Sequence, residues 1–221
     1  MEQIRSCHNN IKRTLIQNTV KRGDYVLDVG CGFGGDTHKW KQVDAFVDMC
    51  DPNESSVKEA MKRTHGHESF RVFKGDVNTS PNRRYNVICY NFSIHYIFEK
   101  KNTFIQSIKS ICDRLEKGGL VIGCIPNSDM IMMYPKFQDS LGNFMIRNTD
   151  RTGNGTWGEK LHVQLVDTPY YKDGPKSEPI AYKDLLITEF KKYNVELMCW
   201  CPFYTDFEIS KMYAYFIFQS Y

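Results

Sequence analysis

The stretch VLDVGCGFGGD, Val26 to Asp36, constrains the fold of this chain more than any other segment. An apolar, strand-like run enters a cluster of glycines, and the sequence then resumes with the spacing of a helix. This order is typical of α/β proteins that hold a nucleotide-like molecule, because glycine lets the backbone turn tightly and approach a ligand closely. Glycines alone are a weak signal, so the identity of the ligand must come from their surroundings.

Segments with strand-like patterns alternate with segments that have helical spacing of their apolar residues. Such alternation predicts a parallel sheet with right-handed crossovers and helices on both faces. Ligands of these sheets bind at the carboxyl ends of the strands. Strands are expected at residues 25–30, 45–49, 69–76, 85–92 and 120–126, and helices at 9–20, 36–42, 52–63 and 102–115.

The second half of the chain departs from this alternation. Residues 126–180 are rich in Gly, Asn, Asp, Pro and Tyr, and we expect them to fold over the open edge of the sheet as a substrate-side insertion. A helix is predicted at 181–193, followed by a final pair of strands at 195–203 and 212–219. Because no repeat or linker interrupts the sequence, a single domain over residues 1–221 is the simplest prediction.

Composition excludes several classes of protein. The net charge of +3 is too small for a protein that coats nucleic acid, although it permits a local basic patch. The first ten residues lack the apolar core of a signal peptide, and no run of about 18 apolar residues occurs, so we expect a cytoplasmic protein with no membrane segment. Among the eight cysteines, Cys199 and Cys201 form a CxC without a second pair, which is poor zinc spacing and favours buried, reduced thiols.

Acidic residues accompany the glycines. Asp28 lies in the strand before Gly30, and Asp36 opens the following helix. Two carboxylates disfavour a pyrophosphate, whereas they suit a ligand with an ammonium and a sulfonium, whose own carboxylate meets backbone N–H groups. S-adenosylmethionine is such a ligand. Its ribose requires an acid about 20 residues further on, and both Asp51 and Asp48 are candidates.

Asp76 follows the third predicted strand, where an adenine amino group would find a hydrogen-bond acceptor. Aspartates at strand-to-helix junctions are also common as caps and turn residues. For any single acid both explanations hold, but acids at four successive strand ends favour the ligand.

A second cluster, NFSIHYIF, ends the fourth predicted strand at residues 91–98. It places aromatic rings and an imidazole where a transferred group would meet its acceptor. Flat aromatic faces stack on a nucleobase, preferentially on a cationic or electron-poor one. Core packing and a structural histidine are the alternative explanation for the same residues, which are Phe92, His95, Tyr96 and Phe98.

In combination, these motifs resemble the mRNA cap guanine-N7 methyltransferases. The blocks NNIKRTLI, VLDVGCGFGGDTHKW, NFSIHYIF and IPNS match in order, and the segment around Glu178 and YAYFIF match more weakly. In its short, divergent character the chain is most similar to the methyltransferase domain of the capping enzyme of a large cytoplasmic DNA virus. That resemblance implies upstream triphosphatase and guanylyltransferase domains in the same polypeptide, and a location in the host cytoplasm or the virion.

The resemblance implies a class I, Rossmann-like fold with a seven-stranded, mostly parallel sheet and a C-terminal antiparallel strand pair. It also implies transfer of a methyl group from S-adenosyl-L-methionine to N7 of the guanine cap of RNA. The implied cofactor residues are Lys12 for the methionine carboxylate, Asp28, Gly30 and Asp36 for the methionine end, Asp51 for the ribose, Asp76 for the adenine, and Asn91 for a backbone contact.

On the cap side, the resemblance implies a guanine pocket built from several segments. The expected contacts are His95 and Tyr96 on the base, Phe92 beside them, Pro126 packed on the guanine, Glu178 at its N1 and N2 edge, and Tyr213 closing the pocket, with His95, Tyr96 and Glu178 as the catalytic set. The chain departs from the family at Phe33, where a lysine is common, and at residues 161–163, where an aromatic pair is replaced. Four basic residues were further candidates for attracting the triphosphate, with plain surface charge as the simpler explanation: Arg83, Arg84, Lys100 and Lys101.

The implied reaction needs no general base, because N7 of guanine carries a lone pair and no proton. Direct in-line displacement would then depend on alignment and electrostatics. Two alternatives are a methyltransferase of another acceptor, which the same loop and acids would serve, and a non-catalytic RNA-binding stimulatory subunit. The second is disfavoured because the glycines and acids are all present.

Overall fold

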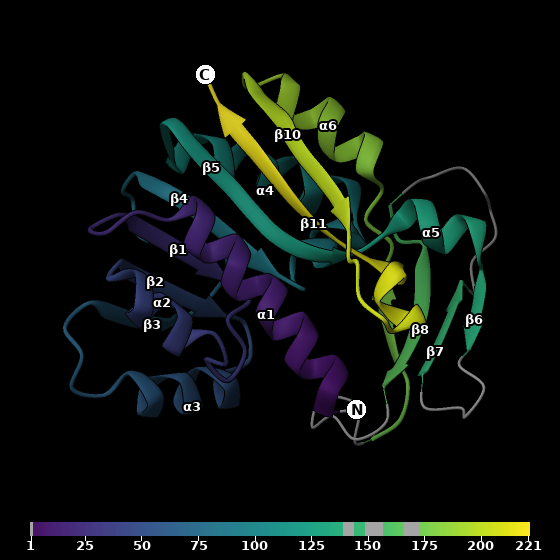
Figure 1. The fold of residues 1–221 in the computed structure, drawn as a ribbon. Helices are drawn as coiled ribbons and strands as arrows, with labels where there is room; N and C mark the ends of the chain where they lie inside the picture. Colours follow the sequence, from purple (N-terminus) through teal and green to yellow (C-terminus); the bar gives the residue numbers. More distant parts are fainter. Residues whose placement is uncertain (1, 139–143, 149–156, 166–172) are drawn as a thin grey trace.

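The computed structural model describes residues 2–138, 144–148, 157–165 and 173–221, which form two sheets (Figure 1). The larger sheet has seven strands in the order β10-β11-β5-β4-β1-β2-β3. These strands are β1 (Tyr25–Val29), β2 (Phe46–Asp51), β3 (Phe70–Lys74), β4 (Tyr85–Asn91), β5 (Leu115–Pro126), β10 (Val195–Pro202) and β11 (Tyr213–Ser220).

Strands β1 to β5 are mutually parallel, whereas β11 runs antiparallel to both of its neighbours, β5 and β10. The predicted fold class is therefore confirmed, including the antiparallel pair at the C-terminal end. Strand β1 lies between β2 and β4, so the chain order reverses at the β1–β4 junction. The carboxyl ends of strands at such a switch point are where open α/β sheets bind ligands.

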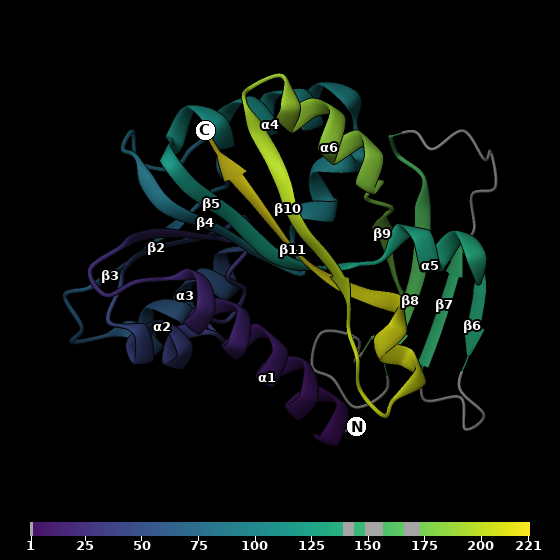
Figure 2. The same cartoon turned by 45° about the horizontal axis from the view of Figure 1, so that its top comes forward.

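Helices cover both faces of the large sheet (Figure 2). On one face, Ile16 and Trp40 pack with Val26 of β1, and on the other Phe104 and Phe190 belong to the same core as Leu27. Successive residues of β1 thus point to opposite apolar layers, which explains why its sequence is almost continuously apolar. The helices are α1 (Glu2–Thr19) and α2 (Thr37–Val43) on the first face, α4 (Lys101–Arg114) and α6 (Lys183–Lys191) on the second, and α3 (Glu54–Thr64) beside β2 and β3.

Helix α1 is longer than the sequence predicted. Its expected start was residue 9, but the helix begins at Glu2. Within the first two turns, Ile4 is an isolated apolar residue that packs partly buried against the core, and its neighbours are polar. Apolar periodicity therefore starts only at Ile11, which explains the difference.

No helix in the described ranges is long and apolar enough to span a membrane.

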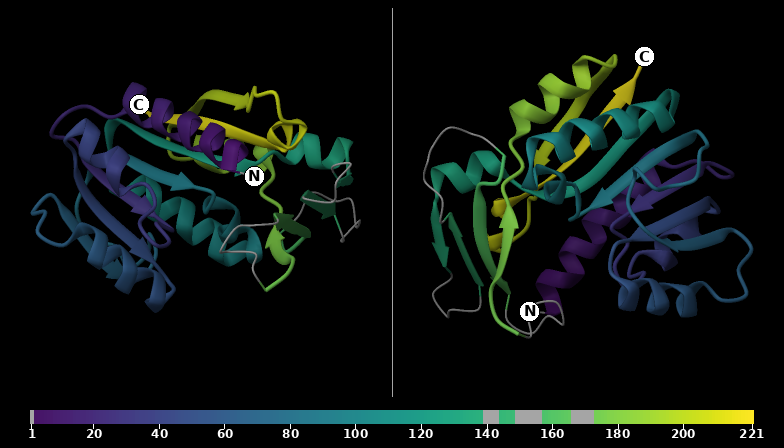
Figure 3. Two further views of the ribbon diagram at one scale, coloured as in Figure 1. Left: turned by 60° about the horizontal axis from the view of Figure 1, so that its bottom comes forward. Right: turned by 180° about the vertical axis from the view of Figure 1, so that it is seen from behind.

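The smaller sheet is formed within residues 126–180, the segment that departs from the strand–helix alternation. It lies beyond the carboxyl ends of β4 and β5 (Figure 3). Its antiparallel order is β6-β7-β8-β9, and it buries Ile146, Leu161 and Val163. Strand β9 packs on the short 3-10 helix η1 (Ile94–Glu99) that follows β4. The elements are α5 (Ser128–Met133), β6 (Lys136–Gln138), β7 (Phe144–Asn148), β8 (Lys160–Leu165) and β9 (Lys176–Pro179).

Candidate functional site

The glycine loop connects the carboxyl end of β1 to α2. Gly30 has a φ of +74°, and a Cβ built there would lie 2.4 Å from the Cβ of Ser93. Its N–H donates to the carbonyl of Cys50 at the end of β2, over 2.8 Å. Only glycine satisfies both the left-handed conformation and this close approach. The loop is therefore held between the ends of β1 and β2 and the segment after β4.

Asp36 is the centre of a buried ionic network. Its Oδ1 lies 2.8 Å from Nζ of Lys12 on α1 and 2.5 Å from Nζ of Lys39 on α2. Its Oδ2 accepts from Nδ2 of Asn91, at the end of β4, over 3.0 Å. Burial opposes ionisation of this carboxyl, but the two ammonium groups prevail and lower its pKa to about 2. Asp36 is thus a fixed negative charge that joins α1, α2 and β4.

The sequence patterns give Lys39 no role, although it lies in the block VLDVGCGFGGDTHKW. Its side chain is fully buried and its Nζ also donates to Oδ1 of Asn9, over 3.3 Å. Burial lowers the pKa of Lys39 below its ordinary value, although Asp36 acts in the opposite direction. The three-residue spacing from Asp36 was the available signal, because it places both side chains on one face of a helix.

Asp28 is buried beneath this network and accepts from Nε1 of Trp40 over 2.9 Å. Burial, reinforced by the charge of Asp36, raises the pKa of Asp28 to about 7. Next to it, Oδ1 of Asn91 is buried and has no hydrogen-bond partner within the described part of the chain. We call the residues Lys12, Asp28, Asp36, Lys39 and Asn91 the acid–lysine cluster.

We expect Asp28→Asn to raise the free energy of unfolding of the ligand-free protein by an amount that grows between about pH 4 and pH 7. The folded state binds the Asp28 proton more tightly than the unfolded chain, so the wild type loses stability as pH rises through that window. A pKa that rises from 3.8 to about 7 corresponds to about 4 kcal/mol. Urea denaturation at about pH 5 and about pH 8 measures the difference, with the exposed Asp44→Asn as the control. A difference that does not change with pH would contradict this expectation.

Of the two candidate acids on β2, only Asp51 points to the glycine loop. Its Oδ2 accepts from the backbone N–H of Gly32 over 2.9 Å. Asp48 is instead occupied elsewhere: Arg71 donates to its two oxygens over 2.7 and 2.6 Å, and the hydroxyl of Tyr85 donates over 2.8 Å. The geometry therefore places Asp51, and not Asp48, at the edge where a ligand would lie.

Asp76 lies exposed in the turn after β3. Its Oδ1 accepts from the backbone N–H groups of Asn78 over 2.9 Å and Thr79 over 3.1 Å. The carboxylate therefore stabilises its own turn, which is the alternative that the sequence left open. An exposed carboxylate retains lone pairs for a further partner, so the turn does not preclude a ligand contact.

Arg83 and Arg84, two candidates for attracting the triphosphate, both precede β4 and so lie at the opposite end of that strand from the site. The guanidinium of Arg83 stacks 3.8 Å above the ring of Tyr25, and Nη1 of Arg84 donates to the carbonyl of Leu115 over 2.8 Å. Lys101 lies nearer, at the start of α4, with its Nζ 5.2 Å from the ring centre of Trp157. The two arginines therefore stabilise the amino ends of the strands.

His95 and Glu178 meet although 82 residues separate them in the chain. Nε2 of His95 on η1 lies 3.3 Å from Oε2 of Glu178 on β9, and the two side chains are 2% and 6% exposed. Neither ring nitrogen of His95 forms an aligned hydrogen bond with a described residue. The ring of Tyr96, 42% exposed, lies 4.3 Å from that of His95 between centroids. The His95–Glu178 pair is thus buried, with the partly exposed ring of Tyr96 beside it.

Aromatic rings gather beside this pair. Phe92 contacts Tyr213 edge to face at 5.5 Å and Phe203 at 6.3 Å between centroids, and Tyr213 pairs with Pro126 between β11 and β5. Burial, with the charge of Glu178, raises the pKa of the Tyr213 hydroxyl above its ordinary value. We call the residues His8, Phe92, Phe203 and Tyr213 the aromatic cluster.

Phe92 adopts a φ of +58°, which is uncommon for a residue with a bulky side chain. Its N–H donates to the carbonyl of Cys124 over 2.8 Å, which holds this conformation at the end of β4. Strained backbone of this kind persists where the surrounding structure over-determines it, and it concentrates at functional sites. Asn91 and Phe92 are consecutive residues, yet Asn91 belongs to the acid–lysine cluster and Phe92 to the aromatic cluster.

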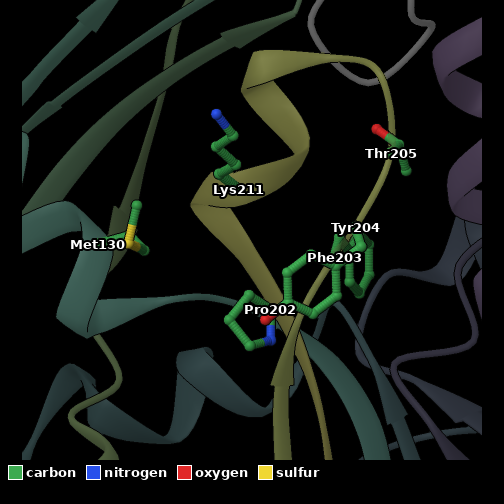
Figure 4. A pocket seen from close by; sticks show the side chains of 6 residues that line it. All are labelled: Met130, Pro202, Phe203, Tyr204, Thr205 and Lys211. Carbon is green, nitrogen blue, oxygen red and sulfur yellow. The ribbon is translucent and has the colours of Figure 1, made fainter.

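A pocket of about 230 Å³ opens next to the aromatic cluster (Figure 4). Phe203 contributes to both, since it lines the pocket and also contacts Tyr213 at 6.1 Å between centroids. None of the site residues predicted from the sequence lines this pocket, so it is distinct from the place where the motifs converge. Its walls are Met130, Pro202, Phe203, Tyr204, Thr205 and Lys211.

The two clusters adjoin each other. Lys12 bridges them, because its Nζ pairs with Asp36 and also lies 6.0 Å from the ring centre of Phe92. One cluster offers fixed charges and an open amide oxygen, and suits a zwitterionic, cationic ligand. The aromatic cluster offers flat rings next to the buried carboxylate of Glu178, and together they suit a planar base with N–H groups on its edge.

Comparisons with known proteins agree with this geometry. A family model described as mRNA (guanine-N(7))-methyltransferase domain matches residues 1–215. The mRNA cap guanine-N(7) methyltransferase of Schizosaccharomyces pombe is 35% identical over 185 residues, which cover 76% of this chain and 48% of that protein. The enzyme of the same name from Candida glabrata is 25% identical over 230 residues, covering 91% of this chain and 55% of that protein. The chain thus spans about half the length of these two relatives.

Solved structures resemble this one at low identity. An S-adenosylmethionine-dependent methyltransferase from Clostridium acetobutylicum is 15% identical with a TM-score of 0.63, covering 98% of this chain and 91% of the other. CalS10, an amino pentose methyltransferase from Micromonospora echinaspora, is 11% identical with a TM-score of 0.62, covering 97% and 92%. At this identity the likeness concerns the fold alone.

Proposed function

We propose, since this chain belongs to the mRNA (guanine-N(7))-methyltransferase family, that it transfers the methyl group of S-adenosylmethionine to N7 of the guanine cap of RNA. The observation that carries the proposal is the buried His95–Glu178 pair next to the aromatic cluster. A buried carboxylate beside flat rings suits the N1 and N2 edge of guanine, because a carboxylate accepts hydrogen bonds from both N–H groups of that edge. The acid–lysine cluster lies at the adjoining strand ends, so donor and acceptor would meet between the two.

The acid–lysine cluster fits the methionine end of S-adenosylmethionine. The buried and unpartnered Oδ1 of Asn91 is an acceptor to which an ammonium group would donate. Asp28 has a raised pKa, and a cation bound nearby would lower that pKa and favour the ionised carboxylate. Lys12 would hold the carboxylate, Asp51 the ribose and Asp76 the adenine. When bound, S-adenosylmethionine supplies an electrophilic methyl group on its sulfonium.

The residues of the chain contribute positioning and electrostatics. Glu178 accepts from the N1 and N2 groups of guanine and favours the positive charge that the base gains. His95 orients Glu178 and the base edge, whereas Phe92, Tyr96 and Tyr213 fix the plane of the ring. Because N7 has no proton to lose, none of these groups acts as a general base, and alignment of the reactants accounts for about 7–11 kcal/mol in favourable cases.

The decisive experiment is radiolabelled methyl transfer to RNA that begins with GpppA. We expect label in the cap, recovered as 7-methylguanosine after nuclease digestion. RNA with a 5′-triphosphate and RNA with a methylated cap are the controls, and neither should be labelled. Label in internal nucleotides or only in a small molecule would favour a different acceptor. Absence of transfer despite calorimetric binding of capped RNA would favour a non-catalytic RNA-binding subunit.

We infer further that the chain is the methyltransferase part of a larger capping enzyme of a large cytoplasmic DNA virus, similar to that of African swine fever virus. Its short and divergent sequence supports this inference, although the relatives named above are fungal. Triphosphatase and guanylyltransferase domains would precede it, and it would act in the host cytoplasm or the virion. The test is to express the protein that the whole reading frame encodes, including any residues upstream of Met1. This protein should release γ-phosphate from RNA ends and form a covalent GMP adduct.

A further inference from the structure

His8 joins the first helix of the chain to a short helix near its C-terminal end. It lies on α1, and its Nε2 is 3.0 Å from Oγ of Ser210 on the 3-10 helix η3 (Glu208–Met212). Ser210 in turn accepts from the hydroxyl of Thr205 over 2.7 Å. No sequence motif indicated this chain of hydrogen bonds, because His8 is 202 residues from Ser210.

The imidazole of His8 also packs among the three other rings of the aromatic cluster. It stacks on Phe92 at 6.4 Å and meets Phe203 at 5.0 Å and Tyr213 at 5.4 Å edge to face, between centroids. Burial and the neighbouring Lys12 lower the pKa of His8 to about 4, so the ring is neutral at physiological pH. A neutral imidazole combines an aromatic contact surface with one directed hydrogen bond, which phenylalanine and asparagine each supply only in part.

Helix α1 connects this ring to the acid–lysine cluster. His8 and Lys12 are four residues apart, so they share one face of α1, one turn from each other. Lys12 forms an ion pair with Asp36, whereas His8 contacts Ser210 of η3 and the three other rings of the aromatic cluster. Helix α1 thus carries one contact with each cluster, and a shift of α1 on binding at one cluster would change the position of the rings at the other.

We propose that His8 is a positioning residue that couples ligand binding at the acid–lysine cluster to ligand binding at the aromatic cluster. This inference rests on the proposed function, because the two ligands are the cofactor and the guanine cap. Coupling between two binding sites is reciprocal, so each ligand increases the affinity for the other by the same factor. Removing His8 reduces that factor without removing any group that touches the cofactor.

Calorimetry measures this coupling directly. The dissociation constant of S-adenosylhomocysteine is determined alone and in saturating GpppA, for the wild type and for His8→Ala. We expect GpppA to tighten binding about tenfold in the wild type, within the range of measured couplings, and less than about twofold in the variant. His8→Phe, which keeps a ring and loses the bond to Ser210, should be intermediate. Ser210→Ala should match His8→Phe, because it removes the same bond.

Control variants separate positioning from stability. His67→Ala changes an exposed histidine and should keep the wild-type coupling. If His8→Ala or His8→Phe lowers both affinities and the melting temperature but leaves the ratio unchanged, the role is merely structural and the inference is overturned. Wild-type protein that binds both ligands without coupling overturns it as well. Wild-type protein that does not bind GpppA at all refutes the proposed function instead.

Discussion

Asp36→Asn is expected to reduce the free energy of unfolding by about 3–5 kcal/mol and to weaken S-adenosylhomocysteine binding by at least about 100-fold. The carboxylate lies between the ammonium groups of Lys12 and Lys39, and all three side chains are at least mostly buried. Without the carboxylate of Asp36, two buried cations lose the partner that lies in contact with both, and leaving a buried charge unpaired is strongly unfavourable. The hydrogen bond that orients Asn91 is also weakened.

Urea denaturation and calorimetry test both parts of this prediction. The matched control is the double variant Asp36→Asn with Lys39→Met, in which one of the two excess cations is also removed. It should recover part of the lost stability, because only Lys12 then lacks a partner. A single variant Asp36→Asn that stays within about 1 kcal/mol of the wild type would show that the network is solvated, contrary to its burial.

Glu178→Gln is expected to slow methyl transfer by about 10²- to 10³-fold, while S-adenosylhomocysteine binds within about threefold of the wild type. The amide keeps the shape of the side chain but loses the charge that favours positively charged guanine. The amide can also place its own N–H group against the N1–H group of guanine, so that two donors repel each other where the carboxylate accepted a hydrogen bond. Because Glu178 is on β9 of the small sheet, whereas every residue of the acid–lysine cluster is on the large sheet or the helices that pack on it, cofactor affinity should be spared.

Single-turnover kinetics and calorimetry on the same preparations separate these effects. Glu99→Gln is the control, since Glu99 is an exposed acid of the neighbouring η1 that pairs with Lys160, and it should retain activity. His95→Ala and Tyr96→Ala should behave like Glu178→Gln: activity is lost and cofactor binding survives. If these variants lost cofactor binding in proportion to activity, the assignment of this pair to the cap would be wrong.

The large sheet was predictable because its strands are buried on both faces. In β1, Val26 and Leu27 enter opposite apolar layers, so the strand is an apolar run that only Asp28 interrupts and that glycines bound. The small sheet was not predicted strand by strand. Its buried apolar residues, such as Ile146 and Leu161, are too few to establish a period of two along short, largely polar segments. Local composition indicated an interruption there and nothing more.

Motif residues could be predicted where the chain itself brings them together. Asp28 and Asp36 are eight residues apart around one loop, so sequence spacing nearly determines their proximity. The choice between Asp48 and Asp51 could not be made, because it depends on Arg71 of another strand, which occupies Asp48. His8 and Phe203 acquire their positions from tertiary contacts, and no spacing pattern in the sequence points to either of them.

The position of β11 has a consequence for the folding of the molecule. Strand β11 lies between β5 and β10, and both of these neighbours precede it in the chain. The sheet therefore cannot grow by adding each new strand in turn to an outer edge: β11, alone or already paired with β10, must pair with β5 across the intervening chain. Closing such long-range pairings is slow, because the entropy of the intervening chain is lost before the contacts form. Since Tyr213 is the first residue of β11, the cap-side wall should become ordered in the same late kinetic step that completes the sheet.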